Sequence, residues 1–147
     1  MTPQIRIKRL RGSSTPLPAY QSAHAAGIDL VADIERVVSI ASRERAAIPT
    51  GIALEIPQGF EGQVRPRSGR AISEGLALIN SPGTIDSDYR GEIKVLLVNL
   101  GERQIEIRPG DRIAQLVIAP VVRAELLEVD DLGDSSRGDG GFGHTGR

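Results

Sequence analysis

Hydrophobic positions recur along most of the chain in short runs with the period of a β-strand. Ile52, Leu54 and Ile56 alternate with smaller or charged residues, and Phe60 and Val64 continue this spacing beyond a turn. Alternation of this kind is typical of a strand that buries one face. Similar runs predict further strands at 5–10, 76–79, 93–100, 104–107, 113–122 and 124–129.

Turn-forming residues separate these runs and decide the fold class. The turn signals all contain proline and glycine, and they stand at 49–51, 57–59, 81–83 and 109–111. Many short strands joined by such turns predict an all-β subunit, a jelly roll or distorted β-barrel. One short helix is expected over residues 68–74, with Ser68 as its N-cap and Gly75 ending it.

The composition changes near the end of the chain. Residues 133–147 are rich in glycine, and Phe142 is their only large apolar side chain. Such a segment buries too little surface to offset its ordering entropy, so it is expected to be flexible. We therefore predict a β-barrel domain over residues 1–132 and a flexible C-terminal tail over 133–147.

Composition and charge exclude several function classes. The 147 residues predict one domain, and the formal net charge of −1 argues against a general nucleic-acid or membrane-surface binder. There is no cysteine, and therefore no disulfide, thiolate metal site or cysteine nucleophile. No apolar run reaches the ~18–20 residues of a membrane span, and the first residues lack the apolar core of a signal peptide. A cytoplasmic protein without nucleic-acid or membrane partners is expected.

Two polar segments in the first half of the chain each admit two interpretations. Asp29 stands between Ile28 and Leu30, and it is either an ordinary carboxylate at a strand edge or turn or part of a site. The segment Arg-Pro-Arg-Ser-Gly-Arg-Ala at 65–71 is either a solvated charged face or a phosphate site. The second interpretation arises because free N–H groups at a helix start favour anions.

The connection over residues 80–91 carries the most information. It places the amide of Asn80, the carboxylates of Asp86 and Asp88 and the phenol of Tyr89 between two apolar strands. A turn requires Pro, Gly and one Asn or Asp, and does not require the rest. An aromatic ring beside carboxylates suits a ligand with a flat or sugar-like face, and a polar hairpin loop is the alternative.

Two later segments also stand out. Gln115 shares a strand face with Ile113 and Val117, and it either caps a neighbouring backbone or contacts a ligand. In the tail, glycines surround Arg137 and Phe142. A linker explains the glycines, whereas an anion-binding nest covered by the Phe ring explains the whole segment.

Together these segments resemble the five motifs of the trimeric deoxyuridine triphosphatase (dUTPase) family. In order, they read AGIDL, RPRSGRA, NSPGTIDSDYRG, GDRIAQL and RGDGGFGHTG, from residue 26 to residue 146. The resemblance implies a jelly-roll subunit and a homotrimer with three active sites at subunit interfaces. It also implies a Mg²⁺-bound triphosphate substrate, with dUTP split into dUMP and pyrophosphate. That reaction keeps uracil out of DNA and supplies dUMP for thymidylate synthesis.

The resemblance also implies a role for each matching residue. Asp86 is expected to activate the water that attacks the α-phosphorus, and Asp29 to bind water on Mg²⁺, which the triphosphate otherwise holds. Phosphate contacts are expected from Arg67, Ser68, Gly69 and Gln115. The uracil and deoxyribose contacts are expected from Asn80, Tyr89 and the backbone around Thr84, Ile85 and Lys94. From the tail, Arg137 and Thr145 would reach the outer phosphates and Phe142 would stack on uracil.

Two departures and two rival functions remain. Arg70 stands where the family usually has an apolar residue, either as surface drift or as an added phosphate contact, and His144 replaces a hydroxyl residue. A dCTP deaminase would share the fold and bind a similar nucleotide. The segment 84–91 with its water-activating Asp86, and the lack of a motif typical of the deaminases, favour the dUTPase instead. A regulatory or structural trimer that binds nucleotides without hydrolysis would not need Asp86 or a complete tail.

Overall fold

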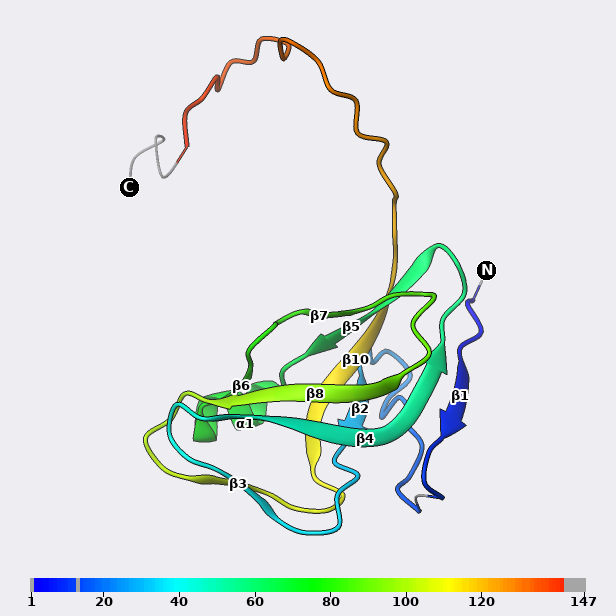
Figure 1. The fold of residues 1–147 in the computed structure, drawn as a ribbon, viewed down its shortest axis with the longest axis vertical. Coiled ribbons are helices and arrows are strands. Elements are labelled where there is room, and N and C mark those ends of the chain that lie inside the picture. The colour runs from blue at the N-terminus through cyan, green and yellow to red at the C-terminus, as the bar shows by residue number, and fades with distance from the viewer. Residues whose placement is uncertain (1, 13, 142–147) are drawn as a thin grey trace.

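Two four-stranded antiparallel sheets enclose one hydrophobic core (Figure 1). The computed structural model describes residues 2–12 and 14–141. The first sheet has the order β1 (Arg6–Arg9), β4 (Arg45–Glu55), β8 (Glu92–Asn99) and β6 (Leu76–Leu78). The second has the order β2 (Ile28–Val31), β10 (Arg112–Pro120), β5 (Phe60–Arg65) and β7 (Gly83–Ile85). A two-stranded ribbon pairs β3 (Val38–Ile40) with β9 (Ile105–Ile107), and the helix is α1 (Ser68–Glu74). The predicted all-β, jelly-roll-like fold with one short helix is confirmed.

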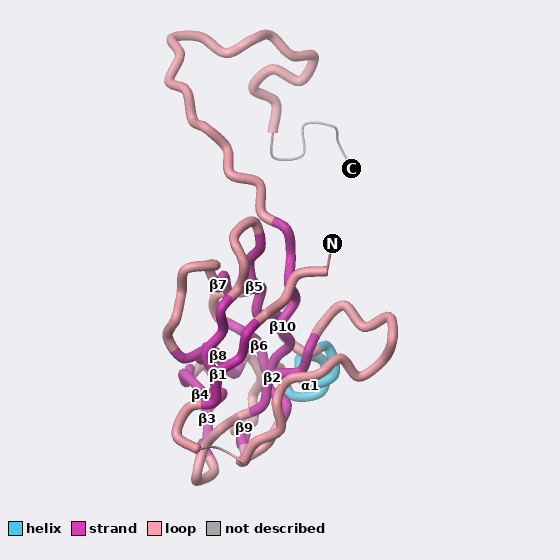
Figure 2. The backbone as a smooth tube through the Cα atoms, turned by 90° about the vertical axis from the view of Figure 1, so that its right-hand side faces the viewer, coloured by secondary structure: helices cyan, strands magenta, loops and turns pink. Residues whose placement is uncertain are grey.

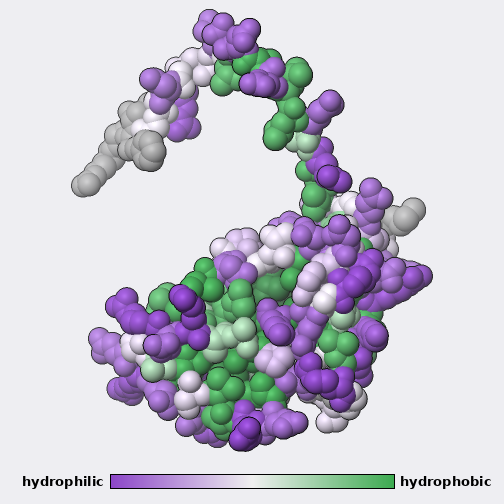
Figure 3. Space-filling model, viewed as in Figure 1, coloured by the Kyte–Doolittle hydropathy of each residue, from purple (hydrophilic) through white to green (hydrophobic). Residues whose placement is uncertain are grey.

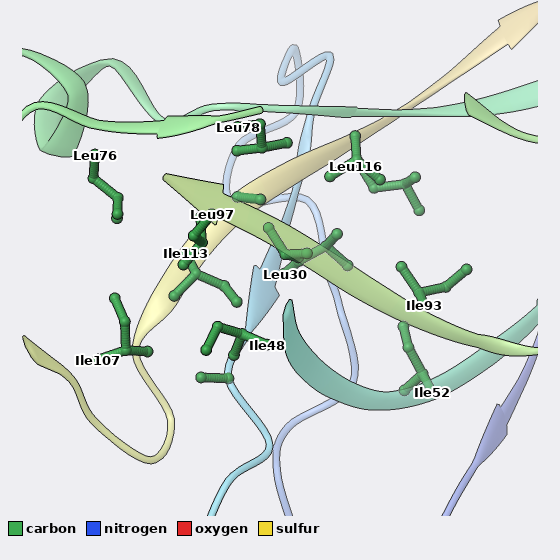
Figure 4. Close-up of a cluster of buried hydrophobic side chains, with 14 of the residues drawn as sticks. Leu30, Ile48, Ile52, Leu76, Leu78, Ile93, Leu97, Ile107, Ile113 and Leu116 are labelled. Carbon is green, nitrogen blue, oxygen red and sulfur yellow. The ribbon is translucent and has the colours of Figure 1, made fainter. Parts of the chain in front are cut away.

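The core is built from aliphatic side chains that both sheets direct inward (Figure 4). On β8, Ile93, Val95 and Leu97 are fully buried, whereas the intervening Lys94 and Leu96 are exposed. This is the alternation that the sequence predicts. Each fully buried aliphatic side chain contributes about 1.5–3 kcal/mol of transfer free energy.

The predicted turn at 49–51 is wrong, because these residues lie inside the long strand β4. The pairing of β4 with β8 shifts register between Pro49 and Ala53, and Gly51 has a φ of 70°. A Cβ at Gly51 would lie 2.3 Å from Oδ2 of Asp33. The glycine therefore serves a β-bulge rather than a turn, and proline is tolerated where the ladder is interrupted. The turns at 57–59 and 109–111 are confirmed, with Gly59 and Gly110 in left-handed conformation.

Helix α1 spans the predicted residues and ends at Gly75, which has a φ of 76°. Its N-cap is Arg67 rather than Ser68, and no side chain caps the first turn. The N-cap prediction for Ser68 is therefore wrong. Ser68 is the first helical residue, where its hydroxyl does not accept the capping hydrogen bond.

The predicted strand at 124–129 is wrong. Beyond β10 the chain runs away from the barrel as an extended arm (Figures 1 and 2). Strand N–H and C=O groups need a partner strand, and within the described residues this arm pairs with none. Its Leu126 and Leu127 side chains are 93% and 82% exposed. Three short strands, β2, β3 and β7, were not predicted as strands. No helix in the described part of the chain has the length and hydropathy to cross a membrane.

Candidate active site

One polar cluster lies where β2, β10 and the start of α1 meet. Asp29 Oδ1 lies 3.0 Å from Arg67 Nε, and Asp29 Oδ2 lies 3.4 Å from Arg112 Nη1. Gln115 is paired with Asp29 in the β2–β10 register, and its Nε2 donates to the Pro66 carbonyl at 2.9 Å. The structure thus brings together Asp29, Arg67 and Gln115, which are predicted to act on the same triphosphate.

The contacts within this phosphate cluster orient its charged groups. The Asp29 side chain is only 17% exposed, and ion pairs with Arg67 and Arg112 compensate its charge. The contact to Arg67 is made by its Nε, and the Arg67 side chain is 28% exposed. Sequence reasoning did not identify Arg112, since only the fold carries it to Asp29. The backbone hydrogen bond of Gln115 matches one of the two interpretations left open for it.

The first turn of α1 borders open space. Ser68 and Gly69 are both exposed, and a Cβ at Gly69 would meet no other atom within 4 Å. A groove of about 1100 Å³ runs alongside, lined by Arg67, Arg112, the helix and residues 101–106. Of the predicted phosphate residues, Arg67 lines this groove, and Ser68 and Gly69 are open to solvent beside it.

A second polar cluster occupies the connection that β7 interrupts between β6 and β8. Thr84 and Ile85 lie on β7, and the Asn80 amide lies close enough to Gly83 that a Cβ there would be 3.1 Å from Asn80 Nδ2. Asp86 is exposed, and its carbonyl accepts the Tyr89 N–H at 3.1 Å. The structure therefore groups Asn80, Thr84, Ile85, Asp86 and Tyr89 in one hairpin.

Tyr89 is held against the end of this hairpin. Its hydroxyl donates to the Glu92 carbonyl at 3.0 Å, and a Cβ at Gly91 would lie 2.4 Å from that hydroxyl oxygen. The lack of a side chain at Gly91 thus leaves room for the Tyr89 hydroxyl, and Tyr89 is 43% exposed. Lys94 follows on β8 with an exposed side chain, opposite Pro49.

The two clusters lie apart within one chain. The connection from β7 to β8, which carries Asp86, and helix α1 occupy opposite sides of the barrel in both views (Figures 1 and 2). Arg137 is exposed on the C-terminal arm, where its Nε donates to the Gly140 carbonyl at 2.6 Å. The predicted contacts from Phe142 and Thr145, together with His144, lie outside the described residues.

Arg70 has a structural role that neither open interpretation included. Its Nε donates to Glu74 at 2.6 Å, its Nη1 lies 3.5 Å from Asp111, and its Nη2 donates to the Glu106 carbonyl at 3.3 Å. The side chain is only 18% exposed. Arg70 thus ties α1 to β9 and to the turn that precedes β10.

The chain is similar to known proteins along nearly its whole length. A family model described as dUTPase matches residues 13–146. The chain is 57% identical over 145 residues to the deoxyuridine 5'-triphosphate nucleotidohydrolase of Anaeromyxobacter sp. (strain Fw109-5), with 97% of each chain covered. It is 56% identical over 142 residues to the protein of that name from Syntrophotalea carbinolica (strain DSM 2380 / NBRC 103641 / GraBd1), covering 97% of this chain and 96% of the relative.

The fold also matches solved structures. The Staphylococcus bacteriophage 80alpha dUTPase with dUPNHPP superimposes with a TM-score of 0.87 at 27% identity, covering 98% of this chain and 99% of the phage protein. All five motif segments fall within the matched residues 13–146. The chain belongs to the dUTPase family and is a dUTP diphosphatase.

Proposed function

We propose that this chain splits dUTP into dUMP and pyrophosphate by attack of an Asp86-activated water on the α-phosphorus. The observation that carries the proposal is the cluster of Asp29, Arg67 and Gln115 beside the open first turn of α1. Guanidinium and amide N–H groups are suitable donors to phosphate oxygens. Arg67, Ser68, Gly69 and Gln115 would hold the triphosphate there.

The residues present fit a Mg²⁺ ion that arrives with the nucleotide. Asp29 offers a single carboxylate, and among the described residues no group of three or more His, Cys, Asp or Glu side chains is placed so that it could hold a metal ion. Mg²⁺ commonly keeps several waters and binds through one or two carboxylates plus substrate phosphates. Asp29 would hold such a water, and Arg67 and Arg112 would fix its carboxylate. When bound, the ion supplies charge neutralisation at the phosphate oxygens.

The second polar cluster, here called the hairpin cluster (Asn80, Thr84, Ile85, Asp86 and Tyr89), would recognise the nucleoside and supply the general base. The Asn80 amide and the backbone of Thr84, Ile85 and Lys94 offer hydrogen bonds to uracil and deoxyribose. Tyr89, fixed over Gly91, would pack on the sugar and exclude a ribose 2′-hydroxyl. Asp86 is exposed beside them and would accept the proton of the attacking water. A positioned base typically contributes ~10²–10⁴-fold to the rate.

Two observations support a homotrimer with shared sites. Helix α1 and the connection from β7 to β8, which carries Asp86, lie on opposite sides of one barrel, so a second chain would have to bring an Asp86 to the first turn of α1. The arm beyond β10 is exposed and carries hydrophobic side chains, including Val122, Leu126 and Leu127 (Figure 3). Exposed apolar surface of this kind suits burial against another chain. The tail over 133–147 would then close a neighbour's site, with Arg137 and Thr145 on phosphates and Phe142 on uracil.

In the cell, this reaction would keep uracil out of DNA and supply dUMP for thymidylate synthesis. We propose that the protein acts in the cytoplasm on free nucleotides, with no nucleic-acid or membrane partner. Its formal net charge of −1 is compatible with that role, because a general nucleic-acid binder would carry excess positive charge.

One assay series tests the activity and separates the rival functions. Pyrophosphate release is measured with dUTP, and ammonia release is measured with dCTP, each with and without a Mg²⁺ chelator. We expect Mg²⁺-dependent pyrophosphate release from dUTP and no ammonia from dCTP. Ammonia release would identify a deaminase, and dUTP binding without turnover would identify a non-hydrolysing trimer.

A further inference from the structure

A cluster of charges outside the two site clusters joins the N-terminal segment to the start of β8. Arg11 forms a bidentate ion pair with the Glu92 carboxylate. Its Nη2 donates to Oε1 at 2.6 Å, and its Nη1 donates to Oε2 at 3.0 Å. The same Nη2 lies 2.9 Å from Asp33 Oδ2. One guanidinium therefore bridges two carboxylate side chains that are only 14% and 15% exposed.

The backbone presents Arg11 to these carboxylates. Arg11 and Gly12 both adopt left-handed conformations, with φ values of 54° and 61°. A non-glycine residue in this region is uncommon. The turn is attached to the β4 bulge, because Leu10 N–H donates to the Gly51 carbonyl at 2.8 Å and Gly51 N–H donates to Glu92 Oε1 at 3.0 Å. Arg11 is therefore held in place on both its backbone and its side-chain sides.

Glu92 links this cluster to the hairpin. Its side chain binds Arg11, and its carbonyl accepts the Tyr89 hydroxyl at 3.0 Å. The phenol also lies close to Gly91, because a Cβ there would be 2.4 Å from the Tyr89 hydroxyl oxygen. A displacement of Glu92 would therefore be passed directly to Tyr89.

We propose that Arg11 is a positioning residue for Tyr89 and thereby helps to select deoxyribose over ribose. The inference rests on the sugar-packing role proposed above for Tyr89. Without the guanidinium, Glu92 and Asp33 would lose the cation that bridges them in a partly buried place, and the repulsion between their carboxylates would increase. The start of β8 would move to separate them, and the space that excludes a 2′-hydroxyl would widen.

The chain offers a direct spectroscopic readout of Tyr89. It contains two tyrosines, Tyr20 and Tyr89, and no tryptophan, so in a Tyr20→Phe background emission excited in the tyrosine absorption band, where phenylalanine does not absorb, comes from Tyr89 alone. In that background, Arg11→Met should increase the quenching of Tyr89 emission by acrylamide. It should also lower the ratio of kcat/KM for dUTP to that for UTP by about 10-fold or more, the scale of a misfitted pocket.

Two further variants control for charge and for folding. Arg6 forms a 3.0 Å ion pair with Glu55 from the same N-terminal segment, but that pair is largely exposed and lies on the β1–β4 edge. Arg6→Met therefore removes an equivalent charge and should change neither readout. Arg11→Lys keeps the charge but not the bidentate contact. Its acrylamide quenching and its dUTP/UTP ratio of kcat/KM should therefore lie between those of the wild type and of Arg11→Met. If Arg11→Met does not fold, Arg11→Lys carries the same comparison.

The outcomes separate this inference from the proposed function. Increased quenching together with reduced sugar discrimination supports it. Equal behaviour of the Arg11 and Arg6 variants overturns it, as does increased quenching with unchanged discrimination. Tyr89→Ala identifies the reason in the last case. If Tyr89→Ala also leaves discrimination unchanged, the sugar-packing role of Tyr89 is wrong. If it abolishes discrimination, Tyr89 keeps its role and Arg11 does not control it.

Discussion

Gly27 leaves room for Gln115: a Cβ at position 27 would lie 2.2 Å from Gln115 Oε1. The glycine therefore permits the side-chain position from which Gln115 binds the Pro66 carbonyl, next to Arg67. The requirement comes from close approach across the β2–β10 pair rather than from a turn.

Gly27→Ala should displace Gln115 and lower kcat/KM for dUTP by about 10-fold or more, since small displacements of positioning groups are costly. The measurement is a double-mutant cycle with Gln115→Ala. Once the amide is gone, the added methyl should have little further effect. Gly133→Ala is the control for glycine replacement as such. Its methyl group would lie in open space, so this variant should leave the melting temperature unchanged. Fully additive losses would show that Gly27 acts independently of Gln115.

Asp86→Asn should lower kcat by about 10²-fold or more with little change in nucleotide affinity, because it removes the base and keeps the shape. Asp88→Asn is the matched control, since Asp88 is an exposed carboxylate in the same connection. Pyrophosphate release and dUTP binding are measured for both. An Asp86→Asn enzyme that retains more than half its activity would show that another group is the base.

Arg70→Leu tests whether Arg70 serves the structure or the phosphates. Its contacts to Glu74, Asp111 and the Glu106 carbonyl predict a loss of about 1 kcal/mol of stability, with the KM for dUTP unchanged. Arg108→Leu removes a more exposed ion pair with Glu106 and should cost less. Thermal unfolding and steady-state kinetics give both quantities. A raised KM with unchanged stability would instead make Arg70 a phosphate contact.

The ion pair of Arg11 with Glu92 predicts a specific response to acid. The hydrogen bond from Arg11 holds the pKa of Glu92 below its ordinary value of 4.5, with help from the Gly51 N–H. Because folding lowers this pKa, its stabilisation is complete above pH 4.5 and is lost as pH falls through the lower, folded value. Below pH 4.5, the melting temperature of the wild type should therefore fall more steeply than that of Glu92→Gln. Glu55→Gln, measured at the same protein concentration, should keep the wild-type slope.

Removal of residues 133–147 should leave folding and assembly intact but nearly abolish dUTP hydrolysis, because a closing tail excludes water and fixes the substrate. Mixing these truncated chains with full-length Asp86→Asn chains, followed by refolding, tests whether the tail acts on a neighbour. Activity should reappear in mixed trimers, where an intact Asp86 meets an intact tail. Verified mixed trimers that stay inactive would show that each chain closes its own site.

The sequence predicts those elements whose signals are local. The alternation around Ile93, Val95 and Leu97 predicts β8 to within one residue at each end, and Gly75 predicts the end of α1. Strand length alone does not decide detection, because β3, β6 and β9 each have three residues and the sequence predicts β6 and β9 but not β3. The turn signal at Gly51 is misleading, since a left-handed glycine serves a bulge as well as it serves a turn.

The site divides in the same way. Residue types and their order along the chain predict the polar segments one by one, because each motif is contiguous, but not that Asp29, Arg67 and Gln115 lie together. Local sequence patterns do not predict contacts between segments that are distant along the chain. Arg11 and Glu92 are 81 positions apart, and Arg112 and Asp29 are 83 apart, so only folding reveals that they are partners.

Among the described residues, the core is complete before the chain reaches its arm. Every residue of the hydrophobic cluster, including those packed at its margin, comes from positions up to Ile118. The leucines of the arm contribute nothing to that cluster and need cover from elsewhere. Dilution should then uncover the arm while the barrel stays folded. The concentration at which the protein is handled would set its tendency to aggregate, while the melting of the barrel itself would depend on concentration far less.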